Sequence, residues 1–389
     1  MAVCRGRPKA LGPSLLLGAC PRAPALGQGP SQQGRPSCRA FPSYCVGLQV
    51  AHAHAHLLEA QARLRVLTVD FVKPFVLKAA ILLRIPDIIA TAAGPDGSLS
   101  LQQIVDQLPS HTVQSDYLYQ ILRFLVAIKV FDEVLVEAAS GEKEKRFRLT
   151  PVSKLLLKDS PICFAPMVLL QTDQVCQAPW HHLHEVVSGG GQAFTKAHGK
   201  DIWEVENENP ALNLVFNNGM VAASRISMHR IVQQYDGFQS LKSLVNVGGG
   251  LGETISQIVA VYPHIHGIIY DLPHVIAIAP HIGGSMFEII PSADAILLKK
   301  VMHDWDDDHC MKVLLNCIRS FQMMESLLLQ TLLTGLIADM VMIAHSNGGK
   351  ERREDEWQNL LNGAEACSII STMAAEYSKY IIKKPETHI

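Results

Sequence analysis

A glycine-rich turn behind a short apolar segment constrains the fold of this chain more than any other feature. The run Leu244-Val-Asn-Val-Gly-Gly-Gly-Leu-Gly252 leads directly into a segment with helical periodicity that begins near Glu253. Glycines let a backbone turn sharply and approach a ligand closely, while a helix start offers free N–H groups to an anion. A strand, a glycine turn and a helix in this order are typical of nucleotide-type cofactor sites in open parallel sheets.

The region around this turn alternates between apolar strands and helices. We expect strands at Leu244–Val247, Gly267–Tyr270 and Ile296–Leu298, with a helix over Ile255–Val261. This alternation predicts an α/β fold, a Rossmann-like parallel sheet with helices on both faces.

The N-terminal part of the chain has a different character. Residues 1–56 are rich in arginine, with no acid before Glu59, which indicates either a transit peptide or an extension without a targeting role. Residues 57–165 predict a mostly helical, winged-helix-like domain with a hairpin over Phe131–Arg148, suited to packing against a partner subunit. Residues 166–389 would form the cofactor-binding domain.

Composition narrows the possible partners. The chain is 48% hydrophobic and 18% charged with a formal net charge of −2, which suits a compact protein and argues against a nucleic-acid partner. Its nine cysteines show no C-x-x-C pairing, so we expect reduced thiols and a cytoplasmic protein. The apolar run Leu327–Ala344 is interrupted by Gln330 and Asp339 and predicts buried core rather than a membrane span.

The spacing of the glycines indicates which cofactor is bound. Asp271 follows Gly248 by 23 residues, where its carboxylate can accept hydrogen bonds from two ribose hydroxyls. A dinucleotide fingerprint would need a third glycine at position 253, which is Glu253. Glycines at 248, 250 and 252 suit S-adenosylmethionine instead. A nicotinamide-dependent oxidoreductase and a glycine turn without a ligand are the alternatives.

A candidate base follows the strand at Ile296–Leu298. His303 lies just beyond the carboxyl end of this strand, and an imidazole there can take a proton near neutral pH. Two histidines and four aspartates within His303–His309 could suggest a metal, but Asp306–His309 is typical of a helix start whose acids face water. We therefore predict no metal. Glu351 could hold the neutral tautomer of His303, or it could be a solvated acid at a helix start.

Taken together, these segments resemble the S-adenosylmethionine-dependent small-molecule O-methyltransferases of plants, of the caffeic acid and flavonoid type. The resemblance covers residues 57–389 and rests on segments that occur in family order: Leu244–Gly252, Tyr270–Val275, Gly284–Phe287, Leu298–Trp305, His309-Cys310 and Asn347–Arg352. It implies a homodimer formed through the N-terminal domain, a small phenolic substrate, and neither nucleic acid nor membrane as a partner.

The resemblance also implies roles for individual residues. The cofactor contacts would be Gly248, Gly250, Asp271, Met286 and Lys299. His303 would take the proton of a phenolic hydroxyl, flanked by Glu351 and Glu325. The phenolic pocket would be lined by His182, Met342 and Ser346.

Two positions depart from the family pattern. Asn246 stands where the family usually has an aspartate, and Ser285 where an acid is usual. Two stretches are also shorter than the family's strands. Between Pro280 and Gly283 little is left for the third strand, and after Phe321 the run Gln-Met-Met-Glu-Ser-Leu-Leu-Leu favours helix where the family has a strand. The loss of a strand would remove part of the core, so these departures predict a weakened sheet and leave one alternative open. The chain could be a catalytically impaired relative that dimerises or binds ligand without turnover.

Overall fold

The computed structural model describes residues 42–383, except 95, 111, 138–140, 277–281, 321–325, 333–334, 347, 365–367 and 375–376. Side chains are described between residues 56 and 364, apart from these gaps and residues 230, 234 and 326–335. The chain divides into two compact units, Met1–Thr68 and Val69–Ile389. Nearly all of the long helix α1 (Pro42–Val69) belongs to the first unit.

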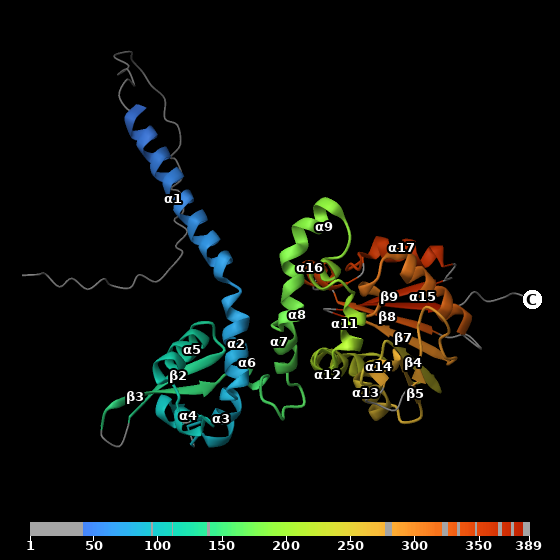
Figure 1. Ribbon diagram of the computed structural model, residues 1–389, viewed down its shortest axis with the longest axis horizontal. Coiled ribbons are helices and arrows are strands. Elements are labelled where there is room, and N and C mark those ends of the chain that lie inside the picture. Colours follow the sequence, from blue (N-terminus) through green and yellow to red (C-terminus); the bar gives the residue numbers. More distant parts are fainter. Residues whose placement is uncertain are drawn as a thin grey trace, which may run out of the picture. The chain divides into compact units, whose positions relative to one another are not determined.

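The second unit begins with helices packed around a small antiparallel sheet of order β1-β3-β2 (Figure 1). Its elements are α2 (Val72–Leu82), α3 (Ile85–Ala92), β1 (Ser98–Ser100), α4 (Leu101–Gln107), α5 (Ser115–Ala127), β2 (Phe131–Glu137), β3 (Lys143–Leu149) and α6 (Pro151–Lys154). Leu122, Leu125, Phe131 and Phe147 are buried at its centre. The hairpin expected over Phe131–Arg148 is confirmed, because β2 and β3 pair along their full length.

A helical segment follows and leads to the large sheet. It comprises α7 (Ala165–Gln171), α8 (Gln174–Gln177), the 3₁₀ helix η1 (Ala178–His182), α9 (Leu183–Gly189), α10 (Ala193–His198), α11 (Ile202–Glu208) and α12 (Pro210–Gln234). The sequence sets the start of α11 because Asp201 and Glu204 form a reciprocal capping box there. Asn209 caps α12 through the N–H of Leu212.

The large sheet has the order β6-β5-β4-β7-β8-β10-β9. The first five strands are parallel, and β10 and β9 are antiparallel additions. The strands are β4 (Ser243–Val247), β5 (His266–Asp271), β6 (Ile282–Gly283), β7 (Ala295–Lys299), β8 (Ser326–Leu332), β9 (Ser368–Ala374) and β10 (Tyr377–Lys383). The intervening helices are α13 (Glu253–Val261), α14 (Pro273–Ile276), η2 (Met302–Asp304), α15 (Asp307–Ser320), α16 (Gly335–His345) and α17 (Glu354–Gly363).

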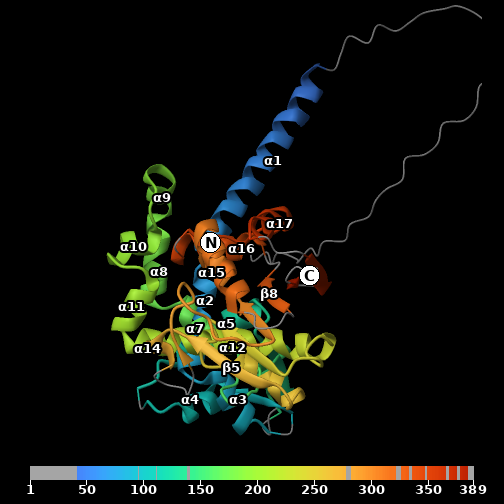
Figure 2. The same ribbon diagram turned by 90° about the vertical axis from the view of Figure 1, so that its right-hand side faces the viewer.

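Helices cover both faces of this sheet, as the alternating apolar sequence predicts (Figure 1 and Figure 2). Ile296 and Leu298 of β7 belong to the core layer formed with α15 and α17. Ala295 and Leu297 of the same strand pack in the opposite layer with α12 and α13. The predicted Rossmann-like architecture is confirmed, and the helix expected from Glu253 begins at that residue.

The prediction that the chain after Phe321 favours helix over strand is wrong. Residues Ser326–Leu332 form β8, which pairs with β7 on one side and with β10 on the other. Backbone partners on both sides outweigh the weak helix preference of leucine, because propensity is readily overridden by tertiary context. The expected loss of a sheet strand therefore does not occur at this position.

The other strand that the sequence predicts to be shortened is indeed short. β6 has only two residues, Ile282 and Gly283, paired with the end of β5. The residues before it, 277–281, lie outside the part that the structure describes. The apolar run Leu327–Ala344 is divided between β8 and α16, and within the described residues no helix is long and apolar enough to cross a membrane.

Candidate active site

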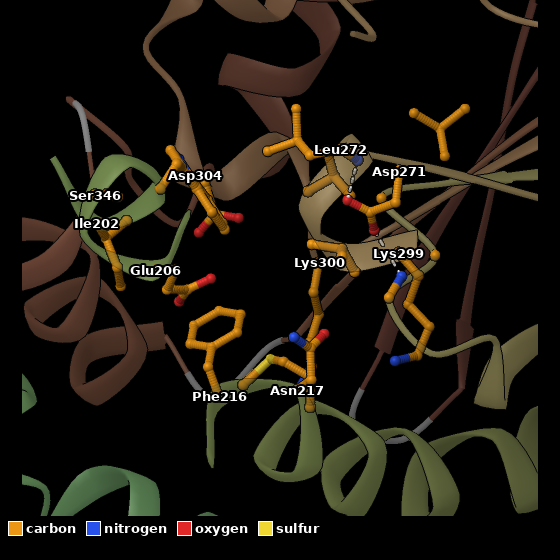
Figure 3. A pocket seen from close by; sticks show the side chains of 18 of the residues that line it. Ile202, Glu206, Phe216, Asn217, Asp271, Leu272, Lys299, Lys300, Asp304 and Ser346 are labelled. Atoms are coloured by element: carbon orange, nitrogen blue, oxygen red, sulfur yellow. Dashed lines mark hydrogen bonds between the residues drawn. The ribbon is translucent and has the colours of Figure 1, made fainter. Parts of the chain in front are cut away.

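A cavity of about 820 Å³ opens at the carboxyl ends of β4, β5 and β7. Its floor is formed by the glycine turn after β4 and by the residues that end β5 and β7. Side chains of α7, α8, α11, α12 and α16 contribute to the walls, and Figure 3 shows part of this lining. Ligands of open α/β sheets bind at this edge.

The glycine turn has a conformation that side chains would disturb. Gly248, Gly250 and Gly252 have φ values of 64°, 54° and 82°. A Cβ atom at position 248 would lie 2.5 Å from Cγ2 of Val301. The turn is held by Asp271, whose carboxylate accepts hydrogen bonds from the N–H groups of Gly250 and Leu272, both at 2.7 Å (Figure 3). Asp271 and the glycine turn, which the sequence predicts as separate parts of the cofactor site, are thus joined by a hydrogen bond.

The other predicted cofactor residues lie beside this unit. Met286 and Lys299 line the cavity, and Nζ of Lys299 donates to Oγ of Ser224 on α12 at 2.7 Å. Burial, aided by the neighbouring charge of Lys300, lowers the pKa of Lys299 to about 7. Asn246 is buried in the same wall, and its Oδ1 has no hydrogen-bond partner among the described residues.

These groups fit S-adenosylmethionine. The close backbone approach leaves room for a nucleoside beside Asp271, and a carboxylate is the group expected to accept ribose hydroxyls. The ammonium of Lys299 is suited to an anionic group, and the unpaired amide oxygen of Asn246 can accept a hydrogen bond.

The candidate base is paired in the same cavity. Nδ1 of His303 lies 2.7 Å from Oε1 of Glu351, so an Nδ1–H donates to the carboxylate and Nε2 is left as the proton acceptor. Nε2 lies 3.6 Å from Oδ1 of Asp304, too far for a hydrogen bond. Burial lowers the pKa of His303, but the carboxylates of Asp304 and Glu351 outweigh it, so the pKa lies above its ordinary value.

Arg352 connects the segment around His303 to the segment that carries Glu351. Its guanidinium donates to the carbonyls of Met302 and Trp305, both at 2.8 Å, and to Oδ1 of Asp307 at 2.8 Å. It also lies over the ring of Trp357, 5.5 Å from the ring centroid. The segment around His303 is therefore fastened to the residue that follows Glu351.

The predicted phenolic-pocket residues do not all reach the cavity. Met342 and Ser346 line it, and Oγ of Ser346 donates to the carbonyl of Met342 at 2.7 Å. His182 is not among the lining residues and pairs instead with Glu185 at 2.9 Å. Glu325, the second acid expected near His303, lies outside the described residues.

Sequence reasoning missed several groups in the cavity wall. Asp304 follows His303 directly, and burial raises its pKa to about 6. Lys300 lines the same region with a left-handed φ of 54°. Glu206 is only 2% exposed, and its Oε1 has no hydrogen-bond partner in the described part of the chain. Asp304 and Lys300 could have been found from their distance to His303 along the chain, whereas no sequence signal marks Glu206.

Two other features bear on the type of site. Trp203 and Trp305 both line the cavity and stack on each other, with centroids 6.3 Å apart and an angle of 15° between the ring planes. Across the residues with described positions, no three histidine, cysteine or acidic side chains gather closely enough to hold a metal ion.

Comparisons with known proteins agree with this geometry. Residues 180–365 match the model of an O-methyltransferase domain, and residues 66–159 match that of an O-methyltransferase dimerisation domain. The fold and the site are those of an S-adenosylmethionine-dependent methyltransferase. More particularly, the chain belongs to the family of O-methyltransferases that includes the caffeic acid 3-O-methyltransferases of plants.

The matches cover nearly the full length of the similar relatives. The caffeic acid 3-O-methyltransferase of Capsicum annuum is 38% identical over 334 residues, which cover 79% of this chain and 93% of the relative. That of Prunus dulcis is 38% identical over 357 residues, covering 85% and 96%.

Among solved structures, human N-acetylserotonin methyltransferase in complex with SAM has a TM-score of 0.74 at 19% identity, covering 84% of this chain and 98% of that one. A mitomycin 7-O-methyltransferase has a TM-score of 0.68 at 22% identity, covering 85% and 100%. At these identities the likeness supports the fold alone.

Proposed function

We propose that this enzyme methylates a phenolic hydroxyl of a small plant metabolite, of the phenylpropanoid or flavonoid type, with His303 as general base. The main observation is that Glu351 pairs with Nδ1 of His303 and leaves Nε2 of the same ring to accept a proton. His303 lines the same cavity as the glycine turn. The names of the relatives, caffeic acid 3-O-methyltransferases, support a phenolic acceptor.

The cofactor-binding role falls to one group of residues: Gly248, Gly250, Asp271, Met286 and Lys299. When bound, S-adenosylmethionine supplies an electrophilic methyl group. The turn and Asp271 position the nucleoside end, and Lys299 offers a cation to an anionic end. Asn246 offers an amide where the family usually has a carboxylate, so it contributes hydrogen bonds without a negative charge.

His303 removes the proton that the acceptor must lose. A phenol ordinarily has a pKa of about 10, so few molecules are ionised at neutral pH and a positioned base matters. Nε2 takes the proton, and the carboxylate of Glu351 at Nδ1 stabilises the imidazolium that forms. Glu325 is proposed as a second flanking acid.

The acceptor occupies the part of the cavity near α16. Met342 and Ser346 line this part, and His182, which lies outside the described lining, stays a candidate contact from the resemblance alone. The apolar side chains of Leu170 and Phe216 in the wall are suited to an aromatic ring.

The impaired alternative has lost one of its supports, because β8 completes the sheet where a strand was expected to be missing, and no comparison favours it.

We further propose the organisation of the whole protein. Residues 1–56 are an extension or a transit peptide, residues 57–165 the dimerisation domain, and residues 166–389 the methyltransferase domain of a homodimer. Cys163, Cys176, Cys310 and Cys317 are buried free thiols, which supports a reducing compartment such as the cytoplasm.

Two measurements on the His303→Ala variant test the proposed function. Methylation of a catechol should fall by about a hundredfold or more, the usual contribution of a general base. Calorimetric titration with S-adenosylhomocysteine should give an affinity close to that of the wild type, because His303 does not hold the cofactor. His266→Ala is the matched control, since His266 is exposed at the start of β5 and does not line the cavity. Undiminished turnover in His303→Ala would refute the base assignment.

A further inference from the structure

A buried acid in the cavity wall has no function in the mechanism described above. Glu206 of α11 is 2% exposed and lines the cavity, and its Oε1 has no hydrogen-bond partner among the described residues. Figure 3 shows its carboxyl group and that of Asp304 turned toward one another. A buried carboxyl group without a partner is costly, so its presence calls for a ligand.

The surroundings of Glu206 disfavour its ionised form. Burial, with the carboxylates of Asp304 and Asp271, raises the pKa of Glu206 to about 9. The residue also lies in the last turn of α11 (Ile202–Glu208), where a negative charge is unfavourable to the helix dipole. Glu206 is therefore protonated and neutral in the free enzyme near neutral pH, and a cation beside it would favour the ionised carboxylate.

We propose that Glu206 binds the protonated amine of a phenolic acceptor, so that the enzyme prefers phenols with an ammonium group on their side chain. The proposal rests on the proposed methylation of a phenolic hydroxyl and names the charge of the acceptor. An ammonium group beside Glu206 would face carboxylates on both sides and would provide the missing hydrogen-bond donor. An acceptor with a carboxylate at the same place would add another negative charge to an acidic wall.

The cavity walls fit the remainder of such a molecule. Phe216 lies on α12, the helix that follows the one carrying Glu206. The apolar side chains of Phe216, Leu170 and Met220 all line the cavity. These side chains suit an aromatic ring, while Glu206 is the polar group that would fix its orientation.

Three catechols that differ mainly in the end of the side chain test the proposal. They are dopamine, 2-(3,4-dihydroxyphenyl)ethanol and 3-(3,4-dihydroxyphenyl)propanoate, which end in an ammonium, a hydroxyl and a carboxylate. Affinities are measured in the presence of S-adenosylhomocysteine by calorimetry, and by tryptophan fluorescence because Trp203 and Trp305 line the cavity. The wild type should bind the amine about tenfold or more tightly than the alcohol, a ratio typical of a hydrogen bond between charged groups. The carboxylate should bind most weakly.

The variant Glu206→Gln keeps the shape of the side chain but cannot ionise beside the amine. It should bind the amine and the alcohol equally well, while its affinity for S-adenosylhomocysteine stays unchanged. Glu208→Gln is the matched control, because Glu208 is an exposed acid on the same helix that pairs with Lys200. This control should keep the preference for the amine.

Several results would overturn the proposal. The first is equal affinity of the wild type for the amine and the alcohol. The second is a preference for the amine that remains in Glu206→Gln. The third is a loss of affinity for S-adenosylhomocysteine in that variant as large as its loss of affinity for the amine. Binding is read without turnover. Absent methylation of every catechol would therefore count against the proposed function alone, and a missing amine preference against the role of Glu206 alone.

Discussion

The carboxylate of Glu351 determines how His303 can act. It accepts the Nδ1–H of the imidazole at 2.7 Å, and its own backbone N–H is held by Asp339 at 3.0 Å. A carboxylate in this position orients the ring, fixes the tautomer that leaves Nε2 free, and stabilises the imidazolium. Glu351 thus acts through His303 rather than on the acceptor.

Replacement of Glu351 by glutamine should therefore change both the rate and its dependence on pH. The base is active when neutral, so turnover rises as pH increases through the pKa of His303. Removal of the negative charge lowers this pKa, because Glu351 is one of the groups that raise it. The rising limb of the kcat/KM profile should move to lower pH, and the maximum rate should fall by about tenfold or more.

The pH–rate profile of Glu351→Gln provides the measurement, with Glu354→Gln as the control at the exposed start of α17. A rising limb that stays in place, or moves to higher pH, would contradict the assigned pairing.

The sequence identified those functional side chains that belong to strong local patterns. Asp271 and Lys299 end strands, Gly248 and His303 lie just beyond strand ends, and the carboxyl ends of parallel strands converge on one edge. Glu206 could not be predicted, because it lies within a short helix whose direction relative to the sheet depends on tertiary packing. For the same reason the sequence could not establish that His182 pairs with Glu185 outside the cavity lining.

Among the elements, the turn between β4 and α13 has the strictest requirement for glycine. Gly248 combines a left-handed backbone with a contact that allows no Cβ atom. The substitution Gly248→Ala should weaken binding of S-adenosylhomocysteine by about tenfold or more, since the backbone strain alone costs roughly 1–3 kcal/mol and the turn must shift away from Val301.

Calorimetric titration of this variant checks the prediction. Gly97→Ala is the control, because Gly97 has a φ of 68° but open space around it. It should lose stability in a thermal unfolding experiment without any change in cofactor affinity. Unaltered affinity in Gly248→Ala would show that the turn tolerates a side chain.

The strands and helices were predictable to different degrees. β4, β5 and β7 are short apolar runs followed by turns or polar residues, a pattern that specifies a buried parallel strand. β8 was missed because its leucine-rich sequence has no β-branched signature and its state is decided by pairing with β7 and β10. Long-range backbone pairing of this kind leaves little trace in local sequence.

For the whole molecule, the first unit raises the question of what covers its apolar side chains. On α1, Leu57, Leu58, Leu64 and Leu67 are all more than half exposed. Contiguous exposed apolar side chains commonly mark an interface, and the matched dimerisation domain begins at residue 66. We therefore expect a second copy of the chain to cover this part of α1.

The double substitution Leu64→Glu and Leu67→Glu should convert the proposed homodimer into monomers. Charges at these positions would have to be buried without partners in the interface, which is costly. Size-exclusion chromatography with light scattering measures the molecular mass. Val187→Glu, at an apolar residue on α9 that is 87% exposed, is the control and should leave the mass unchanged. A dimer that survives the double substitution would place the interface elsewhere.

The backbone of Lys300 has a consequence for attempts to stabilise this enzyme. A left-handed conformation costs a residue with a side chain roughly 1–2 kcal/mol, a cost that glycine does not incur. Lys300 adopts this conformation one residue beyond β7 and three residues before His303. Lys300→Gly is therefore an obvious substitution for raising the thermal stability of the enzyme. It would also remove the Lys300 amino group from the wall of the active-site cavity. A substitution that stabilises the fold at this position thus changes the active site.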